Sequence, residues 1–306
     1  MKHIELGKTG LSVPAIAVGC MRINNIEKTQ VEAFLKNALE QGANYFDHAD
    51  IYGGGTCEEI FAEAIQMNST IREKIILQSK CGIKPGVCYD LSKEHILYSV
   101  DGILKRLKTE YLDVLLLHRP DALVEPEEVA EAFDILHNKG KVRHFGVSNY
   151  NPMQIELLQK YVKQPLHINQ LQFSITNANM MTQGLHVNML DDAAVNRDGS
   201  VLDFCRLNDI TIQTWSPFQY GFFEGVFLGN EKFPKLNETI DGLADKYNVS
   251  NTTIAMAWLL RHPAHMMPVT GTMSISRLTE CLKATKIQLT REEWYAIHMA
   301  AGNILP

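Results

Sequence analysis

Residues 114–121 read VLLLHRPD, a short apolar run that ends in polar side chains. A segment with helical periodicity follows at 127–139, and a second short apolar run comes after it at 143–147. A buried strand, a helix and another buried strand in this order are typical of a βαβ unit, in which the two strands are parallel. The rest of the chain can be searched for the same unit.

The alternation of strand and helix patterns extends over the whole chain of 306 residues. We predict eight buried strands, at 16–19, 45–46, 75–79, 114–117, 143–147, 168–171, 211–214 and 267–269. Helices are predicted near 28–41, 57–66, 92–107, 127–139, 152–160, 200–208, 235–247 and 276–285. Eight alternating units favour an α/β fold of the (β/α)8 TIM barrel type. An open doubly wound sheet that binds a dinucleotide is the competitor, but the sequence has no G-x-G-x-x-G turn.

Both ends of the chain add to the barrel pattern. Strand candidates at 2–6 and 12–15 flank the turn GKTG, which predicts an N-terminal β-hairpin at the barrel floor. Thr290 and Glu293 form a capping-box pattern, which predicts one extra C-terminal helix at 291–300. Because no linker-like stretch divides the sequence, we expect one domain over residues 1–306.

Composition and charge exclude several classes of protein. The formal net charge is −6, which argues against a nucleic-acid binder, since such proteins carry an excess of Lys and Arg. The longest apolar runs, such as 255–260, are far shorter than the roughly 20 residues that cross a bilayer. The six cysteines form no C-x-x-C pair or zinc motif, so we expect reduced thiols in a cytoplasmic protein.

Ionisable side chains follow three neighbouring predicted strands. Asp47 and Tyr52 come after the strand at 45–46, Lys80 ends the next strand, and His118 ends the strand at 114–117. Active sites of (β/α)8 barrels lie at the C-terminal ends of the strands, so we expect these four side chains to converge. A carboxylate that holds a charged lysine beside a phenol suits proton transfer to an oxygen, and the lysine should lower the phenol's pKa from about 10.

Three of the four residues, Asp47, Lys80 and His118, also have a purely structural interpretation. An Asp after a strand is often a turn residue, a Lys at a strand end is usually solvated, and His118 could be a hydrogen-bonded core histidine. Their placement at successive strand ends favours the functional interpretation.

Longer motifs around these residues resemble the aldo-keto reductases. They are FDHADIYG at 46–53, Lys80, LHRPD at 117–121 and GVSN at 146–149, together with LGKTGL at 6–11 and IAMAWLLRHP at 254–263. The resemblance implies a (β/α)8 barrel that transfers a hydride between a nicotinamide cofactor, usually NADPH, and a small-molecule aldehyde, ketone or alcohol. It also implies that Tyr52 donates the proton, Lys80 supports it, Asp47 pairs with Lys80, and His118 orients the substrate oxygen.

The resemblance further implies a set of cofactor contacts. Those that hold the nicotinamide would be Ser148, Asn149, Gln170 and Trp215. The loop across the pyrophosphate would include Ser216, Pro217 and Gly221, and the adenosine 2′-phosphate and adenine would meet Gly271, Thr272, Arg277 and Glu280. Many relatives have Lys at the position of Gly271, so Arg277 is the remaining obvious cation for a 2′-phosphate. We expect NADPH to be preferred over NADH, with the preference resting on Arg277.

Loops that follow the strands supply candidates for the substrate wall. They are Met21, Arg22, Tyr52, Arg119, Tyr150, Phe222 and Phe223, of which Met21, Arg119, Tyr150 and Phe222 are the preferred candidates. Residues 172–199 show no clear helix or strand pattern, and because long unstructured loops are usually functional, we expect a lid or a wall there. His48 stands where the family usually has Thr or Ser, and it adds a titratable group beside the site.

Two other functions compete with a reductase. A metal-dependent barrel hydrolase could use His48, Asp47, Asp50 and His118 as ligands, but there is no H-x-H pair on the first barrel strand and Lys80 has no better partner than Asp47. We therefore predict no metal site. A cofactor-binding regulatory subunit is the second alternative, since a fold does not fix a function, but it would not need all four site residues.

Overall fold

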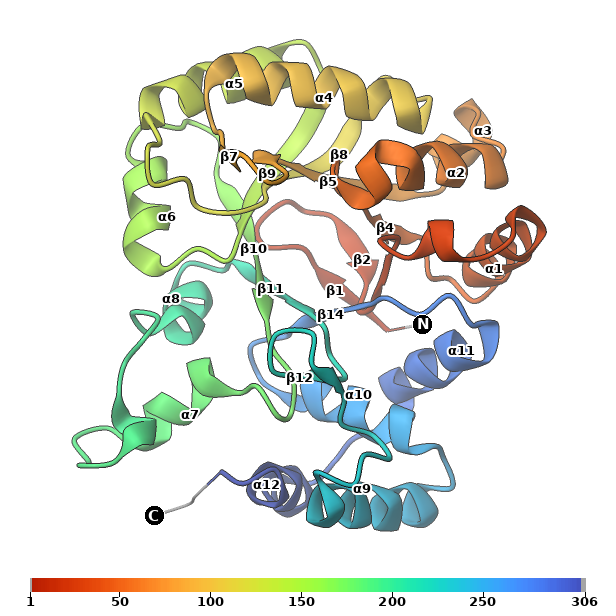
Figure 1. Ribbon diagram of the computed structural model, residues 1–306, viewed down its shortest axis with the longest axis vertical. Helices are drawn as coiled ribbons and strands as arrows, with labels where there is room; N and C mark the ends of the chain where they lie inside the picture. The colour runs from red at the N-terminus through yellow and green to blue at the C-terminus, as the bar shows by residue number, and fades with distance from the viewer. Residues whose placement is uncertain (1, 304–306) are drawn as a thin grey trace.

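Residues 2–303 of the computed structural model form a closed barrel of parallel strands surrounded by helices (Figure 1). The strands are hydrogen-bonded around the barrel in the order β3, β4, β5, β8, β9, β10, β11 and β14, with β14 closing on β3. Their bounds are β3 Ala17–Gly19, β4 Tyr45–Asp47, β5 Ile76–Cys81, β8 Leu112–Leu117, β9 Val142–Ser148, β10 Leu166–Gln172, β11 Thr211–Trp215 and β14 Met267–Thr270. The predicted (β/α)8 barrel is confirmed.

The predicted helices form the outer ring, displaced by one or two residues at most. They are α1 Lys28–Glu40, α2 Thr56–Ala64, α4 Lys93–Leu107, α5 Pro126–Asn138, α6 Pro152–Gln159, α8 Val201–Leu207, α9 Pro234–Tyr247, α11 Ile275–Lys283 and α12 Arg291–Ala300. Helix α4 begins where Ser92 accepts a hydrogen bond from the His95 backbone, and Thr290 and Glu293 form the predicted capping box of α12.

Strand β8 shows how an uninterrupted apolar run serves a parallel barrel. All six of its residues are buried. Val114 and Leu116 pack in the barrel interior, whereas Leu115 and Leu117 belong to the layer between the barrel and the helices. Successive side chains of a strand point to opposite faces, so a strand that is covered on both faces needs apolar residues at every position.

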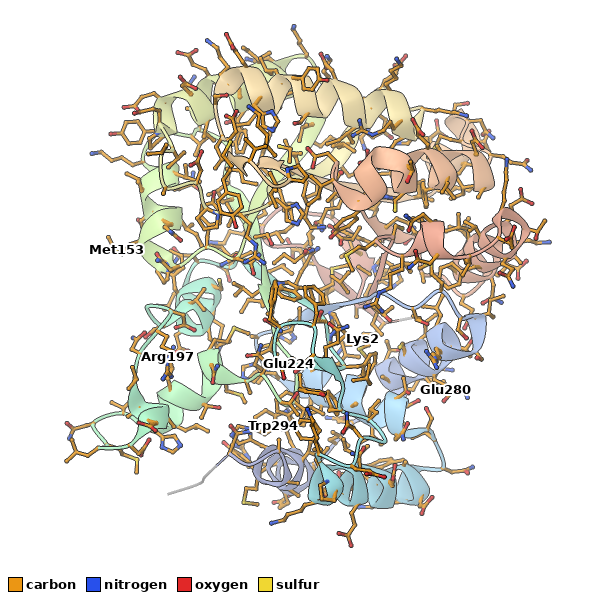
Figure 2. All side chains as sticks on the ribbon, in the orientation of Figure 1. Lys2, Met153, Arg197, Glu224, Glu280 and Trp294 are labelled. Atoms are coloured by element: carbon orange, nitrogen blue, oxygen red, sulfur yellow. The ribbon has the colours of Figure 1, made fainter. Side chains whose placement is uncertain are left out.

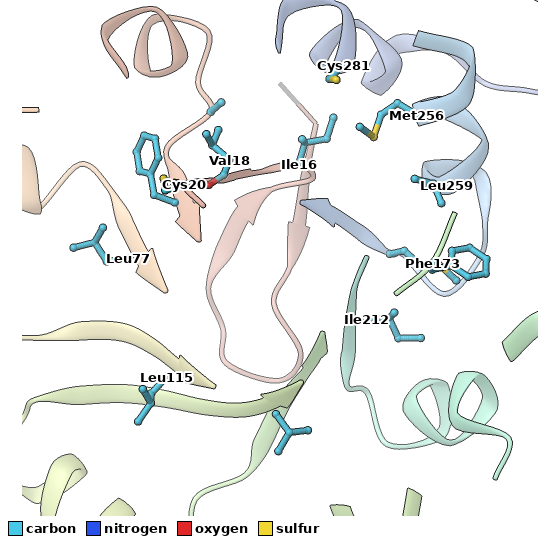
Figure 3. Close-up of a cluster of buried hydrophobic side chains, with 14 of the residues drawn as sticks. Ile16, Val18, Cys20, Leu77, Leu115, Phe173, Ile212, Met256, Leu259 and Cys281 are labelled. Atoms are coloured by element: carbon cyan, nitrogen blue, oxygen red, sulfur yellow. Dashed lines mark hydrogen bonds between the residues drawn. The ribbon is translucent and has the colours of Figure 1, made fainter. Parts of the chain in front are cut away.

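The layer between strands and helices is the larger part of the core. Figure 3 shows side chains from the strands, such as Leu77 and Ile212, and from the helical layer, such as Met256, Leu259 and Cys281. Burial of each large aliphatic side chain contributes about 1.5–3 kcal/mol, so this layer fixes the helices on the barrel.

The N-terminal hairpin closes the barrel opposite the site. Strands β1 (His3–Glu5) and β2 (Ser12–Pro14) pair antiparallel, and Leu6 and Val13 pack with the interior residues of the barrel. The backbone N–H of Gly7 donates to Thr211 Oγ1 over 2.7 Å, which ties the turn to β11.

The extra C-terminal helix is anchored by two stacked tryptophans. Helix α12 packs on α9 and on α10 (Asn251–Arg261), and the rings of Trp258 and Trp294 lie 4.8 Å apart with 6° between their planes. Each indole N–H donates to the other residue's backbone carbonyl over 3.0 Å. Both rings are buried with their polar groups satisfied, which makes this contact specific.

Several elements were not predicted. Helix α10 lies between α9 and β14, and the expectation of one helix there is wrong. Residues 172–199 contain α7 (Asn179–Leu185) and a 3-10 turn at Asp192–Ala194, so this segment is not the unstructured loop that we expected. Other unpredicted elements include the short helix α3 (Ser69–Arg72) and two hairpins. One hairpin joins β6 (Ile83–Lys84) to β7 (Cys88–Tyr89), and the other joins β12 (Gln219–Tyr220) to β13 (Gly225–Val226). None of the helices within residues 2–303 combines the length and the hydropathy that a membrane span requires.

Candidate active site

Lys80 is the centre of the predicted constellation. Its Nζ lies 2.8 and 2.9 Å from the two carboxylate oxygens of Asp47, 2.7 Å from the His48 carbonyl oxygen and 3.2 Å from the Tyr52 hydroxyl oxygen. The lysine side chain has no exposed surface. Burial opposes its charge, but Asp47 and Tyr52 outweigh burial, and the pKa of Lys80 is raised above its usual value. The ammonium ion is therefore fixed between the carboxylate and the phenol.

Tyr52 and His118 face each other at the same end of the barrel. Their rings are 6.0 Å apart in an edge-to-face arrangement. Burial, together with the charges of Lys80 and Arg119, holds the pKa of His118 well below 6.5, so its imidazole is neutral. A neutral imidazole can donate a hydrogen bond to a carbonyl oxygen without losing a charge. The structure thus brings all four predicted residues together.

The prediction that the pKa of Tyr52 is lowered is wrong, because the net shift raises it. Burial raises the pKa of the phenol above its usual value of 10, and the charge of Lys80 opposes this rise without reversing it. Tyr52 is consequently a protonated hydroxyl at neutral pH, which is the form that can donate a proton.

Asp47 is held by two side-chain amides, and sequence reasoning assigned this role to neither of them. Gln78 Nε2 donates to Asp47 Oδ1 over 2.5 Å, and Gln170 Nε2 donates to the same oxygen over 3.1 Å. Both amides also donate to Gln213 Oε1, and Tyr45 donates to Gln78 Oε1. This buried network fills the barrel below Lys80 with satisfied polar groups, so it orients the carboxylate.

Three glycines place Tyr52. Tyr52 begins a 3-10 turn, and Gly53, Gly54 and Gly55 all have positive φ, at 59°, 64° and 97°. A Cβ on Gly53 would come within 2.6 Å of Thr56 Oγ1. The turn therefore requires glycine at this position, and it aims the phenol back over the barrel.

A cavity of about 720 Å³ opens above the four residues. The residues predicted to hold a nicotinamide, Ser148, Asn149, Gln170 and Trp215, all line this cavity. Trp215 Nε1 donates to Asn149 Oδ1 over 3.1 Å, Asn149 Nδ2 donates to Ser148 Oγ, and Ser148 Oγ donates to the Gln170 carbonyl. This chain of hydrogen bonds gives the wall a fixed arrangement beside Asp47.

The other predicted cofactor contacts divide between the cavity and its surroundings. Ser216, Pro217, Gly271, Thr272 and Arg277 line the cavity. Gly221 and Glu280 do not, and the Glu280 carboxylate accepts hydrogen bonds from Lys283 and Thr253. Figure 2 shows Glu280 on α11, on the outer side of the barrel.

A dinucleotide cofactor fits these residues. The cavity extends from the amide-rich wall at Asn149 to Arg277, whose exposed guanidinium forms no ion pair with a carboxylate within residues 2–303. A cationic end suits a phosphate, and an amide wall suits a carboxamide.

The substrate-wall candidates are also divided. Met21 and Arg119 line the cavity. Tyr150 is buried behind it, where its hydroxyl donates to the Arg119 carbonyl over 3.3 Å, and Phe222 is 67% exposed and packs edge-on against Trp215. Phe223, rather than Phe222, lines the cavity and stacks on Trp215 with 24° between the rings.

The segment 172–199 contributes none of the residues that line the cavity, so the expectation of a wall there is wrong. It supports the wall from behind instead. Gln172 Nε2 donates to the Gly221 carbonyl over 2.7 Å, and Ser174 Oγ donates to the Gln219 carbonyl over 2.8 Å. Sequence reasoning missed part of the lining, including Leu228 and Gly229 in the loop after β13 and Asn251 and Thr252 at the start of α10.

The ligand set of the alternative hydrolase is not assembled. Both oxygens of Asp47 accept hydrogen bonds from Lys80, and the His48 ring packs against Phe61 at 4.5 Å. Within residues 2–303, no three His, Cys, Asp or Glu side chains are arranged to share a metal ion.

A closed parallel barrel with these side chains at the C-terminal ends of its strands defines a (β/α)8-barrel protein with its site at the usual rim. The Aldo/keto reductase family matches residues 15–301, and the chain belongs to this family.

Similar proteins include oxidoreductases of bacteria. The chain is 34% identical to the uncharacterized oxidoreductase YcsN of Bacillus subtilis, with 98% of each chain covered. It is 32% identical to 6-dehydroglucose reductase of Novosphingobium aromaticivorans, covering 99% of this chain and 96% of that one. The crystal structure of the thermostable aldo-keto reductase Tm1743 superimposes with a TM-score of 0.78 at 28% identity, covering 98% of this chain and all of that one.

Proposed function

We propose that this chain is an NADPH-dependent reductase that converts an aldehyde or ketone to the alcohol, with Tyr52 as the proton donor. The observation that carries the proposal is the single buried cluster in which Lys80 Nζ contacts both Asp47 oxygens and the Tyr52 hydroxyl. Family membership supports the reaction class, and the cavity above Tyr52 supports a small-molecule substrate.

Each residue of the cluster has a defined role in the proposal. A nicotinamide cofactor supplies the hydride when it is bound. His118 donates a hydrogen bond to the substrate oxygen and so fixes the carbonyl near Tyr52. Tyr52 transfers its proton to that oxygen as negative charge develops, and Lys80 stabilises the resulting phenolate. Asp47 keeps Lys80 charged and in place.

Cofactor preference follows from the charge at the far end of the cavity. Ser148, Asn149, Gln170 and Trp215 would hold the nicotinamide, and Arg277 would bind the 2′-phosphate that distinguishes NADPH from NADH. The chain is proposed to act as one cytoplasmic barrel domain.

The test is turnover of a generic aldehyde by the purified protein, followed as consumption of NADPH. We expect Tyr52→Phe, which removes only the hydroxyl, to lower kcat by at least about 100-fold with little change in NADPH affinity. Tyr161→Phe removes an exposed hydroxyl on the surface after α6 and serves as the matched control. Retention of most of the activity by Tyr52→Phe would refute the role of the phenol, and no turnover by the unmodified protein would refute the function.

A further inference from the structure

Two arginines line the cavity near Tyr52 without an acidic partner. Arg22 lies in the loop after β3, and Arg119 directly follows His118 at the end of β8. The ion pairs that arginines form within residues 2–303 involve other arginines, and neither of these two guanidinium groups takes part in one. Their charges are therefore available to a ligand.

The acid closest to Arg119 in the sequence is already engaged. Asp121 Oδ2 accepts from the Leu91 backbone N–H over 3.1 Å, and its Oδ1 accepts from the Leu123 backbone N–H over 2.9 Å. Tyr150 donates to the Arg119 carbonyl and so ties down the backbone at this position. The loop is thus fixed while the guanidinium stays unpaired.

The cavity as a whole is cationic in an acidic protein. Its positively charged lining residues are Arg22, Arg119 and Arg277, and its negatively charged lining residue is Asp47. The charge of Asp47 is neutralised by the buried Lys80. The chain carries a formal net charge of −6. A concave site with charge opposite to that of the chain concentrates ligands of the complementary sign.

The three arginines that line the cavity fall into two groups by position, Arg277 in one and Arg22 with Arg119 in the other. Arg277 belongs to α11, next to Gly271 and Thr272, at the end proposed for the cofactor's 2′-phosphate. Arg119 lies close enough to His118 for its charge to contribute to the low pKa of that imidazole. Apolar side chains that line the cavity with Arg22 and Arg119 include Met21, Ile51, Ile83 and Phe223.

We infer that the physiological substrate is a carbonyl compound with an apolar body and an anionic group, either a carboxylate or a phosphate. Arg22 and Arg119 bind the anion, while the carbonyl meets Tyr52 and His118. A guanidinium presents several donors in a plane and pairs with either anion bidentately. This inference rests on the proposed reductase function and specifies its substrate.

Matched substrates isolate the contribution of the charge. For the carboxylate, 4-carboxybenzaldehyde is compared with its neutral methyl ester, and for the phosphate, 4-formylphenyl phosphate is compared with 4-methoxybenzaldehyde. We expect kcat/KM to favour one of the charged substrates by roughly tenfold or more, mainly through KM, as for hydrogen bonds to a charged group. The preference should shrink as salt is raised, because both arginines are at least partly exposed.

Variants connect the preference to the two arginines. Arg22→Met and Arg119→Met should each reduce the charged-to-neutral ratio by roughly threefold, the double variant should abolish it, and Arg119→Lys should retain more of it than Arg119→Met does. Arg197→Met, at an exposed arginine on the distant loop after α7 (Figure 2), should leave the ratio unchanged.

Three outcomes would overturn the inference without touching the proposed function. The first is turnover of the neutral aldehydes with no preference for either anionic substrate. The second is a preference for the anionic substrate that survives in the double variant. The third is a loss of NADPH affinity in the arginine variants that is as large as their loss of the substrate preference. The last outcome would assign the arginines to the cofactor. Absence of turnover with every aldehyde would instead refute the reductase function itself.

Discussion

The side-chain amide of Gln78 donates to the carboxylate of Asp47 over 2.5 Å, and neither residue is more than 3% exposed. Gln78 also connects Asp47 to Gln213 on the opposite side of the barrel interior, and it accepts a hydrogen bond from Tyr45, which lies on β4 together with Asp47. The orientation of the Asp47 carboxylate therefore depends on a residue whose side chain forms no hydrogen bond with Tyr52 or Lys80 in the described part of the chain.

Replacement of Gln78 by Met tests this dependence. The thioether is similar in length but forms none of these hydrogen bonds, so Asp47, Gln213 and Tyr45 each lose one partner. We expect the free energy of unfolding to fall by about 2–4 kcal/mol. We expect kcat to fall at least about tenfold because Asp47 is less precisely held. Urea unfolding and steady-state kinetics measure the two effects. Gln164→Met, which loses one hydrogen bond to Asp134 away from the cavity lining, is the control. A stable and fully active Gln78→Met would contradict the positioning role.

Lys80 and Tyr52 should behave as one unit. Lys80→Met removes the charge beside the phenol and leaves Asp47 buried without its cation, so we expect a loss of kcat comparable to that of Tyr52→Phe. The double variant should be little worse than either single variant, since each already abolishes the shared proton transfer. Losses that multiply in the double variant would show that the two residues act independently.

His48 should make the fold sensitive to acid. The ring is fully buried, neither nitrogen has a hydrogen-bond partner within residues 2–303, and burial followed by the charge of Lys80 lowers its pKa to about 3. A histidine whose pKa is depressed in the folded state contributes stability above its unfolded pKa of about 6.5, and that stability is lost as the pH falls towards 3.

We therefore expect His48→Leu to reduce the acid sensitivity. Between pH 6.5 and pH 5 the unmodified protein should lose about 2 kcal/mol of unfolding free energy more than the variant does. The exposed His137→Gln is the control, and it should follow the unmodified protein at both pH values. Parallel curves for His48→Leu and the unmodified protein would show that the buried imidazole does not resist protonation.

Cofactor discrimination should depend on the charges at the far end of the cavity. One guanidinium contact to a phosphate favours NADPH over NADH by roughly tenfold in affinity, and Arg277→Ala should remove most of this preference.

A second variant should increase the preference for NADPH. A Cβ on Gly271 would meet no atom within 4 Å, so Gly271→Lys can add a second cation without a clash and should enlarge the ratio of the two affinities. Calorimetric titration of both cofactors measures the ratios. Equal affinities in the unmodified protein would place the phosphate site elsewhere.

The sequence predicts those features that depend on local pattern. The apolar run of β8 followed by His118 indicates both a buried strand and a residue at its C-terminal end. The capping pair Thr290 and Glu293 likewise marks the start of α12, because the bonds that it forms span only three residues.

Features that depend on closure of the barrel could not be predicted in this way. Gln78 and Gln213 are separated by 135 residues and meet only when the sheet closes, so nothing near Gln78 in the sequence indicates its partner. Helix α10 was missed because residues 253–259 are all buried, which removes the alternation of apolar and polar faces that reveals a surface helix. The net pKa of Tyr52 depends on burial, which the motif alone does not specify.

The stacked indoles of Trp258 and Trp294 give the chain an optical signature. Because their centres are 4.8 Å apart in a buried stack, their electronic transitions couple, and the two rings should contribute to the near-ultraviolet circular dichroism of the folded chain. That contribution should be lost when α12 detaches, whatever happens at the cavity. The remaining tryptophan, Trp215, lines the cavity, so its fluorescence should change when a nicotinamide stacks on it. One chain thus carries two spectroscopic probes, one for the attachment of its last helix and one for occupancy of its site.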